Sequence, residues 1–181
     1  MYSNDNQVVE KTKNWINEFV IGLNLCPFAK VPFDKDKITY KICDSTDEEQ
    51  ILTNIASDML DLYNISPTII ETSFLILPQM VDFEEYLDYL EVCHIILKDL
   101  NLEGHIQIAS FHPDYQFDGT SPGDVENYTN RSPYPMFHFL REDSVERALL
   151  AYPEAKSVPE TNIETMNKMG IEKVKAMLEN M

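Results

Sequence analysis

Side chains that could do chemistry are concentrated between residues 105 and 141 of this chain of 181 residues. His112 is the first candidate for acid–base catalysis, because an unperturbed histidine pKa lies near neutrality and His112 directly follows an apolar, strand-like segment. Asp114, two residues further on, could orient the imidazole ring. The alternative is that the His112 ring only bonds the backbone of its own loop. We predict His112 and Asp114 as catalytic residues that solvent and ligand can reach.

An arginine in the same region is the predicted anion-binding group. Arg131 is one of three arginines in the chain and is flanked by Asn130 and Ser132, so its guanidinium could hold a carboxylate or phosphate through two parallel hydrogen bonds. The alternative is an internal salt bridge from Arg131 to an aspartate at position 114, 118 or 124. For Arg141, an internal salt bridge or a simply exposed position is favoured over ligand binding. The other predicted substrate-binding residues are Asn127, Asn130, Tyr115 and His138.

Cys26 is the candidate nucleophile. It precedes Pro27, and proline favours the first turn of a helix, so Cys26 could be an N-cap residue whose thiolate the helix dipole stabilises. If Cys26 instead ends the preceding helix, the dipole raises the pKa of its thiol, and a buried, inert cysteine is the third possibility. Cys43 and Cys93 fall on a predicted strand and helix, and we interpret both as core residues.

No metal or cofactor site is predicted. A metal shared by His112, Asp114, Asp118 and His138 is conceivable, but their spacing matches neither paired histidines on one helix face nor clustered cysteines. The five glycines form no phosphate-binding loop, because neither GxGxxG nor GxxxxGK[ST] occurs. These patterns therefore argue against a Rossmann-type or Walker-type nucleotide site.

Hydrophobic periodicity predicts the order α-β-α-β-α-β in front of these residues. Capping boxes begin at Thr46 and Asp82, and Gly104 is suited to a helix C-terminus. Helices between consecutive strands imply right-handed parallel connections. We therefore predict the α/β class, as a single-domain sandwich over residues 1–181 with a small, mainly parallel sheet. The expected elements are a helix from 8 to near 26, strands over 38–43, 68–77 and 105–111, and helices beginning at 46 and 82.

The third predicted strand leads into a polar, proline-rich loop over residues 113–135. Two C-terminal helices follow, capped at Asp143 and Thr161, and Gly170 interrupts the second. In parallel sheets, ligands bind beyond the carboxyl ends of the strands, and a loop of this length is usually functional or disordered. We therefore predict a principal pocket bordered by residues 112–118 and 127–138.

The charge is strongly negative and unevenly distributed. The formal net charge is −17, and residues 44–103 contribute −13, from fourteen acidic residues and one lysine. A field of this sign repels nucleic-acid backbones and anionic membrane surfaces, so neither is a predicted partner. No apolar run approaches the length of a membrane span, no secretory signal is recognised, and an odd number of cysteines suits a reducing compartment. We expect a cytoplasmic protein.

Three motifs resemble a known family. They are Asn24-Leu-Cys-Pro-Phe-Ala29; Phe111-His-Pro-Asp-Tyr-Gln-Phe117 with Gly119-Thr120; and Asn130-Arg-Ser-Pro-Tyr-Pro135 followed by His138 and Leu140-Arg-Glu142. In these motifs, and over essentially the whole chain, the sequence is similar to the bacterial domain-of-unknown-function family 1415. The resemblance implies a soluble bacterial protein of this size and implies no activity.

Two functional hypotheses follow from these residues. In the first, the protein is an enzyme that acts on a small anionic metabolite, with His112 as acid or base, Arg131 as anion clamp and Cys26 as nucleophile or pocket wall. In the second, it is a non-catalytic module whose loop over residues 112–135 forms a rigid platform for a ligand or a protein. Tyrosine, arginine and phenylalanine are favoured at interfaces, so composition allows both. An enzyme requires that His112, Arg131 and Cys26 line one cavity.

Overall fold

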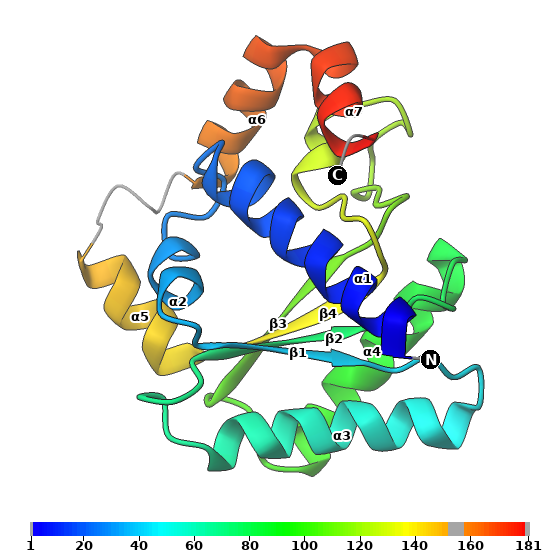
Figure 1. The fold of residues 1–181 in the computed structure, drawn as a ribbon, viewed down its shortest axis with the longest axis vertical. Coiled ribbons are helices and arrows are strands. Elements are labelled where there is room, and N and C mark those ends of the chain that lie inside the picture. The colour runs from blue at the N-terminus through cyan, green and yellow to red at the C-terminus, as the bar shows by residue number, and fades with distance from the viewer. Residues whose placement is uncertain (1, 152–157, 180–181) are drawn as a thin grey trace.

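The computed structural model describes residues 2–151 and 158–179 as a mixed α/β fold (Figure 1). Helices precede, connect and follow the strands of one central sheet. The elements are α1 (Tyr2–Asn14), the π-helix η1 (Trp15–Ile21), α2 (Lys30–Asp34), β1 (Ile38–Ile42), α3 (Glu48–Asn64), β2 (Thr72–Ile76), α4 (Phe83–Asp99), β3 (Ile106–Phe111), the 3-10 helix η2 (Val125–Thr129), β4 (Met136–Arg141), α5 (Glu142–Ala151), α6 (Val158–Met169) and α7 (Ile171–Glu179).

The sheet has four strands in the order β1-β2-β4-β3. β1 and β2 are parallel, with Ile38 opposite Thr72, whereas β4 runs antiparallel to both of its neighbours, with His138 opposite Phe74 and Ala109. The prediction of an α/β fold is confirmed, but the prediction of a mainly parallel sheet is wrong. β4 lies between β2 and β3, so the second and third strands of the chain do not pair with each other.

β4 is the strand that the sequence patterns did not predict. Phe137 and Phe139 are fully buried on one face of the sheet, and Met136 is fully buried on the other. Because both faces of β4 are covered, the strand is a short, nearly continuous apolar run without the polar alternation that marks a half-exposed strand. The segment therefore gave no period-2 signal between the loop and the helix that follows.

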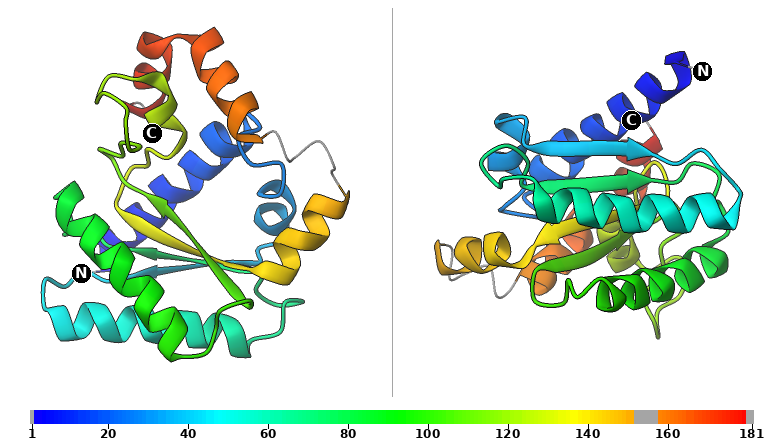
Figure 2. Two further views of the ribbon diagram at one scale, coloured as in Figure 1. Left: turned by 180° about the vertical axis from the view of Figure 1, so that it is seen from behind. Right: turned by 90° about the horizontal axis from the view of Figure 1, so that it is seen from below.

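Helices cover the two faces of the sheet (Figures 1 and 2). α3 and α4 pack on one face, where Ile55, Met59 and Cys93 form a core with the β4 phenylalanines. α1 and η1 cross the other face, and there Trp15 and Phe19 meet side chains of α6 and α7. The sheet is thus enclosed between two hydrophobic clusters, and each cluster contributes burial free energy in proportion to its apolar area.

Aspartate side chains begin the two long helices. The carboxylate of Asp47 accepts a hydrogen bond from the backbone N–H of Gln50 (3.0 Å), and Asp82 accepts one from Glu85 (2.9 Å). The cap predicted at Asp82 is confirmed, while that of α3 lies one residue beyond the predicted Thr46. α4 ends at Asp99, so Gly104 does not cap it and lies in the turn before β3.

The C-terminal helices differ from their predicted starting points. α5 begins at Glu142 directly after β4, and α6 begins at Val158, so the caps predicted at Asp143 and Thr161 are wrong. The interruption at Gly170 is confirmed: this glycine has φ +80° and separates α6 from α7.

The first helix changes geometry where it meets the sheet. It is α-helical to Asn14 and continues as a π-helix, with Gly22 N–H donating to the Asn17 carbonyl (3.0 Å). A Cβ atom at Gly22 would lie 2.1 Å from the Glu18 carbonyl oxygen, so only glycine fits the end of this helix. The wide turns of η1 bury Trp15, Ile16 and Phe19 against the sheet. π-Helical turns are frequent at functional sites.

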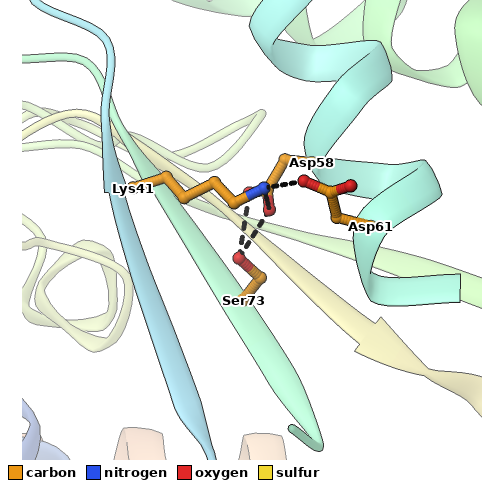
Figure 3. A network of polar contacts seen from close by, with 4 residues as sticks. All are labelled: Lys41, Asp58, Asp61 and Ser73. Atoms are coloured by element: carbon orange, nitrogen blue, oxygen red, sulfur yellow. Dashed lines mark hydrogen bonds and ion pairs between the residues drawn. The ribbon is translucent and has the colours of Figure 1, made fainter. Parts of the chain in front are cut away.

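A buried ion pair joins β1 and β2 to α3 (Figure 3). Asp58 is 1 % exposed, and its carboxylate accepts hydrogen bonds from the Ser73 hydroxyl (2.8 and 2.9 Å) and lies 3.0 Å from the Lys41 ammonium, which also bonds Asp61 (2.6 Å). Burial raises the pKa of Asp58, and Lys41 and Ser73 oppose that rise. The pair lines a hollow of about 420 Å³, in which Lys41 contacts both aspartates and each carboxylate therefore has a cation beside it.

Replacement of Lys41 tests how strongly this pair holds the α3 face. Lys41→Met strands the buried Asp58 carboxylate without a counter-charge, so we expect a loss of about 3 kcal/mol in the free energy of unfolding, measured by urea denaturation. The matched control is Asp61→Asn, which removes only the exposed partner and should cost less than about 1 kcal/mol. Equal losses in the two variants would show that burial of Asp58 does not depend on Lys41.

Candidate functional site

His112 lies inside the protein instead of at an accessible strand end. Its side chain is 0 % exposed and packs between the rings of Phe83 and Tyr86, each with a centroid 5.1 Å away. Nδ1 accepts a hydrogen bond from the Asp114 backbone N–H (3.0 Å), so Nε2 carries the proton and donates to the Met80 carbonyl (3.3 Å). The predicted access to solvent and ligand is therefore wrong.

The environment keeps this ring neutral. Burial lowers the pKa of His112, and the hydrogen bond to Met80 and the charge of Asp114 oppose the change only in part. Asp114 does orient the imidazole, but through its backbone N–H and not through its carboxylate. Both ring nitrogens form hydrogen bonds with backbone groups, so His112 connects the loop to Met80, in the segment before α4.

The predicted polar residues of the loop also bond to the loop itself. Asn127 is fully buried, and its amide binds the Phe117 N–H (2.9 Å) and the Ser121 carbonyl (2.8 Å). Asn130 donates to the Ser110 carbonyl (3.0 Å). The Tyr115 hydroxyl lies 3.2 Å from that of Ser110. These side chains order the loop over residues 113–135, and they line neither of the hollows of about 340 and 420 Å³.

Arg131 braces the same loop. Its Nε donates to the Tyr115 carbonyl (3.2 Å), its Nη2 donates to the Pro122 carbonyl (2.9 Å), and the guanidinium lies 4.1 Å from the centre of the Tyr128 ring. Within the described residues it forms no salt bridge, so the alternative of an ion pair with a loop aspartate is not observed either. The Arg131 carbonyl accepts a hydrogen bond from the Trp15 indole (3.0 Å), which ties the loop to η1.

A cavity of about 340 Å³ lies elsewhere, on the sheet face beside η1, α2 and α5. It opens near the amino ends of β1 and β2, where the antiparallel β4 has its carboxyl end. We name it the β4 cavity. Its apolar walls include Trp15, Phe28, Phe74, Phe111, Leu140 and Ala148. Its polar groups include Cys26, Glu71, Thr72, His138, Arg141 and Arg147.

The predicted border of the pocket is therefore wrong in most of its residues. Of the ranges 112–118 and 127–138, only His138 lines the β4 cavity, and Cys26 is the other predicted site residue there. His112 and Arg131 do not line it, so the three residues expected to converge do not. The β4 cavity does lie at the carboxyl end of a strand, but this strand was not anticipated.

His138 is a neutral histidine in the wall of the cavity. Its ring stacks on Phe74 with a centroid distance of 3.8 Å, and Nε2 lies 2.6 Å from the Thr72 hydroxyl. Because that hydroxyl donates its proton to the Phe139 carbonyl (2.6 Å), Nε2 must be the donor to Thr72. Burial lowers the pKa of His138 to about 3. Nδ1 thus carries a lone pair, and it has no hydrogen-bond partner in the part of the chain that the structure describes.

Cys26 lies in the turn between η1 and α2. Ala29, and not Cys26, is the N-cap residue of α2. Burial raises the pKa of the Cys26 thiol, and hydrogen bonds from the backbone N–H groups of Phe28 and Ala29 only partly oppose the rise. The prediction of a thiolate stabilised at a helix N-cap is therefore wrong, although Cys26 is partly accessible where Cys43 and Cys93 are buried.

Arg141 and Arg147 were not predicted to belong to a site. Arg141 Nη2 donates to the carbonyls of Leu62, Ile65 (2.6 Å) and Ile70 (3.4 Å), at and just beyond the C-terminus of α3. Its Nε is buried and has no partner among the described residues. Burial lowers the pKa of Arg141, which Glu71 opposes, and a guanidinium remains charged in proteins. The signal available in the sequence was two arginines six residues apart in a very acidic chain.

Two further features bear on the possible chemistry. Over residues 2–151 and 158–179, no group of three or more histidine, cysteine or acidic side chains is placed to hold a metal ion. Within the same ranges, no helix combines the length and the apolar character that crossing a bilayer requires.

Comparison with known proteins gives one match. The model of a family described as "Protein of unknown function (DUF1415)" matches residues 7–176, nearly the whole chain. No curated protein and no solved structure matches the sequence.

The low pKa of His138 predicts a loss of stability in acid. Below pH 6.5 the unfolded chain binds a proton at His138 while the folded ring stays neutral to about pH 3, so this contribution to stability falls as the pH falls through that window. Between about pH 7.5 and pH 4.5, the parent protein should lose about 2–3 kcal/mol more than His138→Gln, measured by urea denaturation. The exposed His105 supplies the control, and His105→Gln should behave like the parent.

Cys26 should be the most reactive of the three cysteines. Partial access through the β4 cavity should allow iodoacetamide to alkylate Cys26 in the folded protein before Cys43 and Cys93. Because burial raises the pKa of Cys26, the rate should keep rising above the ordinary pKa of a thiol. Peptide mass spectrometry after short labelling times measures the order. Labelling of all three cysteines only upon unfolding would contradict it.

Proposed function

Because the chain belongs to the DUF1415 family of proteins of unknown function, we propose a function from the β4 cavity itself: the protein binds a small, mainly apolar organic molecule there. The observation that carries the proposal is the convergence of apolar side chains from η1, α2, all four strands of the sheet and α5 on a volume of about 340 Å³. Sites for small molecules are typically concave and apolar, with a few placed polar groups and volumes from about 300 Å³ upward.

The polar groups of the cavity suit recognition. His138 is held by its stack on Phe74 and its bond to Thr72, so its orientation is determined before a ligand arrives. A pKa of about 3 keeps the ring neutral near neutral pH, and Nδ1 can then accept a hydrogen bond from an N–H or O–H of the ligand. Such a preformed acceptor in an apolar wall favours one orientation of the bound molecule.

Binding is better supported than acid–base catalysis. An efficient general acid or base has a pKa near the working pH, whereas that of His138 lies far below neutrality. His112 is enclosed, and both of its nitrogens bind backbone groups. The enzyme centred on His112 that the sequence suggested is therefore not our proposal.

A platform for a protein partner is also less well supported. Such a platform would present the tyrosines of the loop to solvent. Tyr128 is buried instead, and Tyr115 packs against Phe83 and Phe117. The loop has most of its aromatic surface turned to the protein, which favours the cavity as the place where binding occurs.

Filling the cavity tests the proposal. The neutral probe is naphthamide, which should bind the parent protein with a dissociation constant between about 10 µM and 1 mM, as expected for a ligand of its size. Ala148→Phe places a ring in the cavity and should weaken binding about ten-fold or more in isothermal titration calorimetry. Trp15, the single tryptophan, lines the cavity, so its fluorescence reports occupancy independently.

The matched control lies on the same helix. Glu146 is exposed and is not among the cavity-lining residues, so Glu146→Phe adds the same ring outside the cavity and should leave the affinity unchanged. Melting curves of both variants verify folding. Absence of saturable binding by the parent, or equal affinity in parent and Ala148→Phe, would refute the proposed function.

A further inference from the structure

We infer that the ligand of the β4 cavity is an aromatic carboxylate, bound with its carboxylate toward Arg141 and Arg147 and its ring among the aromatic walls. This inference rests on the proposed function and names the chemical class of the ligand. It follows from a charge imbalance in the cavity wall and from the kind of side chains that make up the remaining wall.

The charge imbalance lies in the arginines. The chain has 31 acidic residues, yet within the described ranges no carboxylate lies within salt-bridge distance of Arg141 or Arg147. Arg141 is half-buried and is held by neutral carbonyls, while its Nε lacks a partner. A buried cation is stabilised by a counter-charge, and among the described residues Arg141 has no carboxylate in direct contact.

One acidic side chain faces the same cavity and limits the charge of the ligand. Glu71 lines the cavity and acts on Arg141 at longer range. Against Arg141 and Arg147 it leaves a net charge of one positive unit, because His138 is neutral. A monoanion would neutralise this unit. A phosphate dianion would exceed it and would also lose more hydration free energy in walls this apolar. A carboxylate therefore fits the site better than a phosphate.

The wall opposite the polar groups favours a flat, aromatic body. Trp15, Phe28, Phe74 and Phe111 line the cavity together with the His138 ring. Trp15 and Phe111 meet edge to face at 5.1 Å, and Phe74 and His138 are stacked. Aromatic rings attract further rings in these two geometries beyond the area that they bury. The guanidinium groups favour a planar carboxylate in a similar way, because its two oxygens match two parallel N–H groups.

A matched pair of probes tests the inference on the unmodified protein. Naphthoate and naphthamide have the same ring and nearly the same shape. They differ in the negative charge of the carboxylate and in the two N–H donors of the amide, from one of which His138 Nδ1 can accept a hydrogen bond, so tighter binding of naphthoate must come from its charge. Titration calorimetry near neutral pH should show naphthoate binding about ten-fold or more tightly than naphthamide. Naphthyl phosphate, the dianionic probe, should bind more weakly than naphthoate. Each comparison is independent of any substitution.

Variants then show which arginines cause the preference for naphthoate over naphthamide. Arg147→Gln, at an exposed position, should reduce the ratio of naphthoate to naphthamide affinity several-fold, and Arg141→Gln should abolish it while naphthamide still binds. Arg131→Gln removes an arginine outside the cavity and should leave the ratio unchanged. Because Arg141 also bonds the end of α3, Arg147→Gln provides the test that does not disturb folding.

The outcomes separate the two proposals. Equal affinities of the parent for naphthoate and naphthamide, tighter binding of the phosphate, or a preference that survives in Arg147→Gln and Arg141→Gln would overturn the carboxylate inference while the apolar binding site stands. If neither naphthoate nor naphthamide binds, the proposed function fails, and the inference fails with it.

Discussion

The antiparallel pairing of β4 between β2 and β3 is the constraint on which the rest of the structure depends. It places the carboxyl end of β4 beside the amino end of β2, with Leu140 opposite Thr72. α5 begins at the next residue, so it lies against the sheet where β4 ends and contributes Ala148 to the cavity. His138 reaches Thr72 through the same register. A shift of one residue would move His138 to the opposite face of the sheet and remove it from the cavity.

Two cations of the sheet hold the C-terminal half of α3. Lys41, from β1, pairs with the buried Asp58 and the exposed Asp61 of that helix. Arg141, from β4, donates to the carbonyls of Leu62 and Ile65, where the helix dipole is negative. In a chain of net charge −17, basic side chains are scarce, and these two join secondary structure elements instead of solvating the surface. The end of α3 and the wall of the β4 cavity are thereby connected through one guanidinium.

Local patterns predicted the parts of the fold that depend on neighbouring residues. β1 is marked by alternation and β2 by a nearly continuous apolar run. The cap at Asp82 is a carboxylate three residues before an N–H group, and the break at Gly170 uses glycine's positive φ, so all of these are readable in short windows. The site depends on distant contacts. Arg141 donates a hydrogen bond to a carbonyl 79 residues away in the sequence. The His112 ring donates one to the carbonyl of Met80, which is 32 residues away. No spacing rule within a window reveals such partners.

The loop over residues 113–135, which concentrates the reactive side chain types, acts on the cavity from a distance. Its asparagines and Arg131 satisfy the backbone of the loop, and the Arg131 carbonyl in turn fixes the Trp15 indole. Trp15 is the first residue of η1 and a wall of the β4 cavity. The loop therefore holds an aromatic wall of the cavity by a hydrogen bond between residues that are 116 positions apart in the sequence. The polar groups that suggested a catalytic centre are thus accounted for as groups that order the loop, and through the Arg131 carbonyl the loop supports one wall of the β4 cavity.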